Sequence, residues 1–409
     1  MPSEDLIELL GGWEGYRVGF VTRTAGVGDG QPGTVSIELI RQADGPMVCS
    51  GCGRTCERYH DFEERRVRDL PILGAQTHLL LNRFRVSCPT CGPKLEELPW
   101  LAKYARVTRR LAESVARLCR HMSVKHAAEF FGLRWDAAKA IDKGFLEATL
   151  GEPDLSRVTQ LAMDEFAIRR GQRYATIIVE PNRKEILHVC RGHGREDVRP
   201  FFEKLGRDGC LRIEAVAMDM NGAFEAEVRA QCPRAAIVYD PFHVVAKYGR
   251  EVVDTVRSSE AKRQDNKADR AIVKGSRWLL LKNKQNLAGP DRVKLRELLR
   301  VNRRLATVYV LKDDLKRFWD YYLPNPARNF FMSWYGRAIR SRIEPLKRFA
   351  RQLRAKLDGI LAHCRYPLHT SLLEGINNKI KVIKRMAYGF RDDEYFFLKI
   401  RAAFPGNPG

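Results

Sequence analysis

The chain has 409 residues, of which 44% are apolar and 9% aromatic, so it has room for two to four folded domains and is not a disordered polymer. Its 72 Lys and Arg against 50 Asp and Glu give a formal net charge of +22, which favours a polyanionic partner, above all nucleic acid. A membrane surface is the competing explanation, but the chain has no long apolar run, no signal-peptide layout and an acidic start. We therefore expect a cytoplasmic, nucleoid-associated protein.

Two Cys-x-x-Cys pairs lie in the N-terminal quarter of the chain, and glycines beside each pair allow tight turns. Four thiolates form a closed structural zinc site, and the strand-like runs Arg65–Leu70 and Thr77–Val86 between the pairs suit a zinc ribbon. Two unrelated pairs of reduced cysteines are the alternative. The predicted zinc ligands are Cys49, Cys52, Cys88 and Cys91.

The six other cysteines are scattered, and we expect them to be small, buried, apolar residues of a protein in a reducing compartment. Cys56 and His60 lie near the first pair and are poorer candidates for the same ion.

From residue 107 to residue 146 the apolar residues recur with the period of a helix. Arg109–His121 carries one apolar face, Val124–Phe131 follows, and Gly132 breaks the pattern before Arg134–Ile141. This arrangement is typical of a helix-turn-helix, although a three-helix bundle with a basic face has the same pattern. The second helix would present three side chains to a DNA major groove: Arg134, Trp135 and Lys139.

Between residues 159 and 239 the pattern alternates between strands and helices. Three strands, a helix, a strand, a helix and a strand are the order of an RNase H-like sheet, in which the first and fourth strands are neighbours. We expect a turn at Gly171 and Gln172. The expected strands are Gln160–Ile168, Tyr174–Val179, Glu185–Cys190, Ile213–Met218 and Ala235–Tyr239, and the helices are Val198–Leu205 and Ala223–Arg229.

Three carboxylates stand out on this framework. Asp164 and Asp219 come at the ends of the first and fourth strands, and Glu374 lies in a helix expected over Thr370–Arg385. Three acidic groups on a rigid sheet and a flanking helix can bind two Mg²⁺ ions, with Mn²⁺ as an alternative, for an in-line displacement at phosphorus. Each also has a structural explanation, as a turn former, a helix cap or a surface charge. Their joint placement favours catalysis.

Further residues accompany the carboxylates. After the fifth strand, Asp240 is either a helix cap or a functional group, and His243 is either structural or positions the scissile phosphate or leaving oxygen. On the Glu374 helix, Asn378 would bind phosphate or water, and Lys381 and Lys384 would hold the DNA backbone.

The gap between Asp219 and Glu374 is too long for one crossover, so we expect an insertion. Residues 244–350 are helix-like and contain 26 Lys and Arg against 11 Asp and Glu. Most of the aromatic residues here belong to a helical core. Trp319 is the first choice for a residue that stacks on a base at a distorted DNA end.

The expected fold is thus an α/β RNase H-like catalytic core with an inserted all-α domain, preceded by a zinc ribbon and a helix-turn-helix. The expected domains are a β extension over residues 1–45, the zinc ribbon over 46–100, the helix-turn-helix over 101–150, the first part of the core over 155–243, the basic helical insertion over 244–365, and the C-terminal part of the core over 366–409.

This order, together with four short motifs, resembles the bacterial insertion-sequence transposases of the ISL-three family from about Glu38 to Ile400. The motifs are Met163-Asp164-Glu165, Met218-Asp219-Met220, Asp240-Pro241-Phe242-His243 and the stretch from Glu374 to Lys381.

The resemblance implies a DDE transposase in which Asp164, Asp219 and Glu374 bind two metal ions that activate the attacking oxygen and stabilise the leaving oxygen. It also implies that the N-terminal modules recognise the terminal inverted repeats in double-stranded DNA, and that a dimer pairs two ends for insertion into target DNA. An RNase H-like nuclease without strand transfer and a zinc/helix-turn-helix regulator derived from a transposase are the alternatives.

Overall fold

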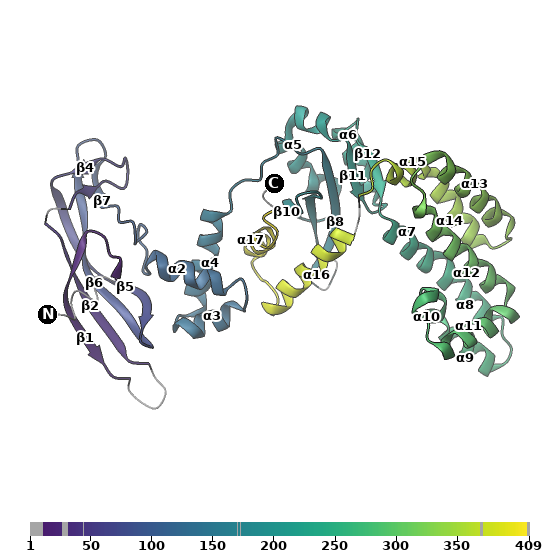
Figure 1. Ribbon diagram of the computed structural model, residues 1–409, viewed down its shortest axis with the longest axis horizontal. Coiled ribbons are helices and arrows are strands. Elements are labelled where there is room, and N and C mark those ends of the chain that lie inside the picture. Colours follow the sequence, from purple (N-terminus) through teal and green to yellow (C-terminus); the bar gives the residue numbers. More distant parts are fainter. Residues whose placement is uncertain are drawn as a thin grey trace. The chain divides into compact units, whose positions relative to one another are not determined.

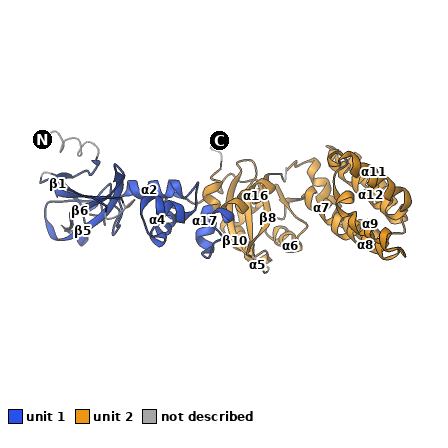
Figure 2. Cartoon of the chain, turned by 90° about the horizontal axis from the view of Figure 1, so that it is seen from below, with its two compact units in different colours: residues 1–151, 384–399 blue, residues 152–383, 400–409 orange. Residues whose placement is uncertain are grey.

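The computed structural model describes residues 11–26, 32–43, 45–169, 171, 173–368 and 371–406. The expected turn residue Gln172, the helix start at Thr370 and parts of the expected extension over 1–45 lie outside this range. The chain divides into two compact units (Figure 2), one formed by residues 1–151 and 384–399 and the other by residues 152–383 and 400–409.

The first unit begins with a five-stranded sheet of order β1-β2-β6-β5, with β7 paired to β6. The strand-like runs expected between the cysteine pairs extend into one long hairpin of β5 and β6. It turns at Leu73 and Gly74, whose φ values of 48° and 77° fit the twist of a two-residue hairpin turn. The strands are β1 (Tyr16–Thr24), β2 (Thr34–Arg41), β3 (Met47–Val48), β4 (Thr55–Cys56), β5 (Tyr59–Ile72), β6 (Ala75–Cys88) and β7 (Gly92–Leu95).

Three helices follow, as the sequence predicts: α2 (Arg109–Leu118), α3 (Val124–Phe131) and α4 (Trp135–Thr149). The Ser123 hydroxyl caps α3 by accepting the His126 N–H at 3.2 Å. Gly132 ends that helix in the left-handed conformation, with φ of 61°. The sharp turn between α3 and α4 is therefore encoded locally.

The last helix, α17 (Asp393–Ala403), contributes to the same unit through residues up to Lys399. Lys399 Nζ donates to the Cys119 carbonyl at 2.7 Å and to Asp142 Oδ2 at 2.8 Å, and the Tyr395 hydroxyl also donates to Asp142. A carboxylate as buried as Asp142 requires such partners. The stretch 366–409, expected to stay with the catalytic core, is thus shared between the two units.

The second unit contains a five-stranded sheet of order β10-β9-β8-β11-β12 (Figure 1). The first and fourth strands of this region, β8 and β11, are parallel neighbours, as the sequence predicts. The elements are β8 (Gln160–Arg169), β9 (Arg173–Glu180), β10 (Glu185–Arg191), α5 (Arg195–Arg212), β11 (Ala215–Met218), α6 (Gly222–Gln231) and β12 (Ala236–Tyr239).

The described chain from α7 to α16 is helical, and the helices up to η4 cover the stretch where the basic helical insertion was expected. No described helix combines the length and the apolar character needed to span a bilayer. The helices are α7 (Pro241–Tyr248), a π-helix η1 (Gly249–Val253), α8 (Asp254–Lys262), α9 (Lys267–Gly275), α10 (Arg277–Leu281), η2 (Lys284–Asn286), α11 (Gly289–Val301), α12 (Arg303–Lys316), η3 (Arg317–Asp320), α13 (Pro324–Arg340), α14 (Glu344–Ala355), α15 (Leu357–Leu361), η4 (Ala362–Cys364) and α16 (Ser371–Met386).

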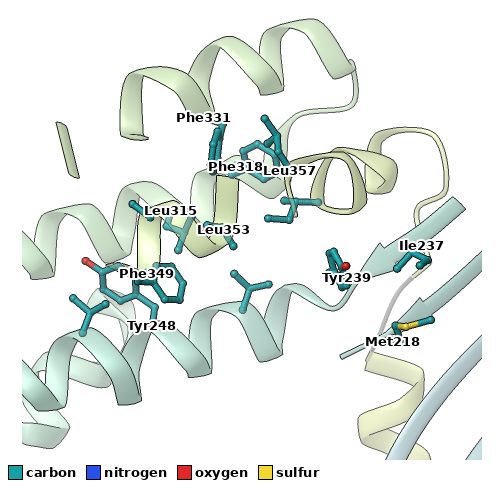
Figure 3. Close-up of a cluster of buried hydrophobic side chains, with 14 of the residues drawn as sticks. Met218, Ile237, Tyr239, Tyr248, Leu315, Phe318, Phe331, Phe349, Leu353 and Leu357 are labelled. Carbon is teal, nitrogen blue, oxygen red and sulfur yellow. The ribbon is translucent and has the colours of Figure 1, made fainter. Parts of the chain in front are cut away.

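One hydrophobic core joins the sheet of the second unit to its helical insertion. Figure 3 shows this cluster running from Met218 and Tyr239 on the strands to Phe331 and Phe349 on the helices. Because the core is continuous, the insertion is anchored rigidly to the strands that carry the candidate carboxylates.

Candidate catalytic and zinc sites

Asp164 lies on β8, and Asp219 directly follows the adjacent parallel strand β11. The register of β8 and β11 pairs Ala162 with Ala217, and each Asp follows two residues later. Asp164 is 7% exposed, whereas the side chain of Asp219 is 40% exposed. The structure therefore places these two carboxylates next to each other, with one more open to an incoming substrate.

His243 lies among the acidic groups. Its Nδ1 is 3.0 Å from Asp219 Oδ2, and its Nε2 is 3.7 Å from Asp240 Oδ2. The Asp240 side chain also caps α7, accepting the Phe242 N–H at 2.7 Å. The hydrogen bond to Asp219, together with the charges of Asp219, Asp240 and Asp164, outweighs burial and raises the pKa of His243 to about 9. These acidic groups thus favour the protonated form of His243, and they would favour another cation in the same way.

The two aspartates differ in pKa. Burial raises the pKa of Asp164, and the opposing effects of the His243 charge and the hydrogen bonds from Glu165 and Asn377 do not cancel it. Burial also acts to raise the pKa of Asp219, but the hydrogen bond and charge of His243 lower it overall. A second cation beside Asp164 would favour its ionised form.

Asn377 is a site residue that sequence reasoning missed. Its Nδ2 donates to Asp164 Oδ2 at 2.6 Å, and the described chain offers its buried Oδ1 no hydrogen-bond partner. Asn378, the expected residue, is exposed and accepts from Lys381 at 3.4 Å. Glu374 is exposed in the first turn of α16, three residues before Asn377 and therefore on the same side of the helix.

These groups suit a hard cation, since carboxylate and amide oxygens are the ligands that Mg²⁺ prefers. Among the described residues, however, the four cysteines of the expected zinc ribbon are the only group of three or more His, Cys, Asp or Glu residues whose ligand atoms gather closely enough to hold an ion, all within 4.8 Å of one another. Asp164, Asp219 and Glu374 are thus less tightly gathered than the cysteines.

The cysteine site is closed and prepared for metal. Cys49, Cys52, Cys88 and Cys91 converge as the sequence predicts. The Gly51 N–H donates to Cys49 Sγ and the Cys91 N–H to Cys88 Sγ, each at 3.4 Å. The backbone N–H of Cys91, followed by that of Thr90, outweighs burial and lowers the pKa of Cys88 to about 6, so a thiolate is favoured there.

Cys56 is buried beside the four cysteines in a small apolar cluster and is not one of the convergent ligands.

Comparison with known proteins identifies the family of the chain. Residues 161–400 match a family model described as a transposase, the DDE domain of the ISL3 type. Residues 96–145 match the helix-turn-helix domain of transposase family ISL3, and residues 45–91 match the zinc finger of the transposases of IS204, IS1001, IS1096 and IS1165. The chain belongs to the ISL3 family of transposases.

Two relatives match this transposase over all or most of its length. It is 51% identical over 410 residues, the whole of both chains, to the transposase for insertion sequence element IS1001 of Bordetella parapertussis. It is 26% identical over 371 residues, 85% of this chain and 83% of the relative, to the transposase for insertion sequence element IS1557 of Mycobacterium tuberculosis. The resemblance drawn from the sequence is confirmed: the protein is a DDE transposase with a zinc ribbon and a DNA-binding helix-turn-helix.

The three expected DNA-contacting residues of α4 in this transposase differ in their surroundings. Arg134 is exposed, with its Nε 3.2 Å from Asp136 Oδ1, and Trp135 is 54% exposed. Lys139, in contrast, lies 2.9 Å from Asp392 Oδ2, so its charge is already paired within the unit. Arg134 and Trp135 are therefore the better-presented candidates.

Of the other expected DNA contacts in the transposase, Lys381 is exposed on α16 and Lys384 is half-buried. Trp319 is half-buried in the helical insertion, where its ring packs against Phe318.

Proposed function

We propose that Asp164, Asp219 and Glu374 bind two Mg²⁺ ions, with Mn²⁺ as an alternative, with which this transposase cleaves the end of its insertion sequence and joins it to target DNA. The observation that carries the proposal is the placement of Asp164 on β8 and of Asp219 directly after the parallel neighbour β11, with His243 Nδ1 3.0 Å from Asp219 Oδ2. Bound ions supply an activated oxygen nucleophile and neutralise charge on the leaving oxygen.

The surrounding residues fix the carboxylates. Asn377 Nδ2 donates a hydrogen bond to Asp164 Oδ2, and the Glu165 N–H donates one to Asp164 Oδ1. His243 orients Asp219 from the first turn of α7. Glu374, exposed on α16, is the ligand free to adjust when DNA enters. The strand order supports an RNase H-like core of residues 155–243 and 366–383, with residues 244–365 inserted.

The N-terminal modules would recognise the terminal inverted repeats, with Arg134 and Trp135 of α4 reaching the DNA and Lys381 and Lys384 holding its backbone. Two ends must meet for transposition, so we propose a dimer on paired ends. Light scattering of the complex with end DNA should give the mass of two protein copies and two duplexes. A complex of one copy on one end would contradict the dimer.

A strand-transfer assay tests the proposed function. Wild-type protein, Mg²⁺ and a labelled fragment carrying the element's own end should yield joined products, and Asp219→Asn should abolish them. Asp208→Asn, which changes an exposed carboxylate of the same unit, should behave as wild type. Cleavage without joining would favour the nuclease, and specific end binding without cleavage would favour the regulator.

A further inference from the structure

Helix α7 lines a cavity as well as carrying His243. His243 points to Asp219, whereas its neighbour Phe242 lines a cavity of about 710 Å³ in the helical insertion. Val245, Ala246 and Gly249 of the following turns line the same cavity. One helix therefore connects the candidate metal site to a cavity large enough for a nucleotide.

The cavity walls are aromatic and incompletely covered. Phe242 is 62% exposed and Trp278 is 65% exposed. Trp319 lines the cavity as well, and the described part of the chain provides no acceptor for its buried indole N–H. Indole N–H groups are normally hydrogen-bonded when buried, and flat exposed rings are typical of surfaces that stack on a ligand. These walls suit a planar ligand.

The rim of the cavity is basic. Arg250, Arg277 and Lys316 line it, and the lining carboxylate Asp254 is paired with Arg277 at 3.0 Å. The Arg277 guanidinium also lies over the Trp278 ring, 5.4 Å from its centroid. The charge balance therefore favours an anionic ligand, such as a phosphodiester with a base attached.

Arg250 links the cavity to the carboxylates. It is exposed and belongs to the π-helix η1, which directly continues α7, seven residues after His243. Single π-helical turns are rare and occur frequently at functional sites. A phosphate held by Arg250 would thus lie on the same continuous helical segment as His243, which contacts Asp219.

We propose that this cavity receives a nucleotide extruded from the DNA duplex beside the scissile phosphate, with its base stacked on Trp278 and Phe242 and its phosphate held by Arg250 and Lys316. Paired bases have no free face, so stacking on these rings requires an unpaired base. The inference rests on the proposed function for its ligand, because that function places DNA at Asp219.

A binding measurement in Ca²⁺, which needs no turnover, tests the proposal. Two duplexes of the element's end are compared, and both carry an abasic nucleotide opposite one position near the cleavage site. In one duplex that position keeps its base, and in the other it is abasic as well. The cost of unpairing is then the same in both duplexes. Positions are scanned on both strands with full-length wild-type protein, Trp278→Ala, and the control Tyr322→Ala, which changes another highly exposed aromatic residue of the insertion.

At one position, the wild type and Tyr322→Ala should bind the duplex with the base about ten-fold to a hundred-fold more tightly than the duplex without it. Trp278→Ala should bind both about equally, and Trp278→Phe, which keeps a flat ring, should restore part of the preference. Absence of a preferred base at every position, or a preference that persists in Trp278→Ala, overturns the proposal. This readout requires only DNA binding. A failed strand-transfer reaction would contradict the proposed function, and the base preference measured here would still support or overturn the nucleotide-binding cavity.

Discussion

The two candidate metal sites of this transposase differ in how completely the folded chain gathers their ligands. The four cysteine sulfurs come from two short turns and lie within 4.8 Å of one another. The carboxylates come from β8, from the residue directly after β11 and from α16, and a histidine lies against one of them. A closed site stabilises a fold, whereas a site that handles DNA must remain open to it. Metal should accordingly hold the first unit together and leave the folding of the second unit almost unaffected.

The largest difference between the two sites should appear in the variant Cys88→Ser, which removes one of the zinc ligands. Binding of a structural zinc ion contributes on the order of 10 kcal/mol to the folding of small zinc modules, so the zinc ribbon should lose its ion and unfold. Metal analysis of this variant should find no zinc. Thermal melting should show an unchanged unfolding transition for the second unit. Cys56→Ser, which changes a buried cysteine outside the ligand group, should keep its zinc. A full zinc content in Cys88→Ser would contradict the assignment.

The next effect concerns the open site. Asn377→Ala removes the hydrogen bond to Asp164 and should lower the strand-transfer rate about ten-fold to a hundred-fold, as for other groups that orient metal ligands. Its melting temperature should change little. Asn378→Ala, at the exposed neighbouring position, should retain nearly the wild-type rate. Equal losses in the two variants would mean that Asn377 does not position Asp164.

Much of this fold was predictable from the sequence because its signals are local. Strand periodicity and element order gave the neighbouring positions of Asp164 and Asp219, and paired cysteines gave the zinc site. The hydrogen bond from Asn377 to Asp164 was not predictable, because positions three and four residues after Glu374 share one helix face and the sequence does not show which of them reaches the sheet.

Contacts between distant parts of the chain were also missed. Tyr395 and Lys399 reach Asp142 across 253 and 257 positions, and Asp392 reaches Lys139 across 253. Nothing in the local pattern of α4 or α17 indicates these partners, so they could not be predicted from the sequence.

Ion pairs rather than metal should account for the acid sensitivity of the second unit. Glu227 of α6 is buried and accepts from Arg195 at 2.6 Å and Arg199 at 3.0 Å. Burial acts to raise the pKa of Glu227, but these hydrogen bonds lower it from 4.5 to about 2. The resulting stability is complete above pH 4.5 and is lost as the pH falls towards 2.

Glu227→Gln should therefore destabilise the second unit by about 2 kcal/mol at neutral pH and remove this part of its acid sensitivity. Urea unfolding between pH 2 and 7 measures both effects. An acid-sensitivity profile that matches the wild type would show that another carboxylate is responsible.

The smallest effect concerns α4 of the zinc-dependent unit. Arg134→Ala should weaken binding of end DNA about five-fold and reduce the salt dependence by about one counterion. Lys139→Ala mainly breaks the ion pair with Asp392, so its effect on affinity should be smaller. Fluorescence anisotropy at several salt concentrations compares the two variants. A larger loss for Lys139→Ala would mean that this lysine leaves Asp392 to bind DNA.

The central claim, that Asp164, Asp219 and Glu374 share bound metal, is tested most directly by iron-induced cleavage of the protein chain. Fe²⁺ takes the place of Mg²⁺ in the transposase bound to end DNA. Hydroxyl radicals formed with ascorbate and peroxide then cut the protein backbone beside the ion. We predict cuts near all three residues, suppressed by excess Mg²⁺ and absent in Asp219→Asn. Cuts near the two aspartates but not near Glu374, or cuts that persist in Asp219→Asn, would contradict a single site built from these three carboxylates.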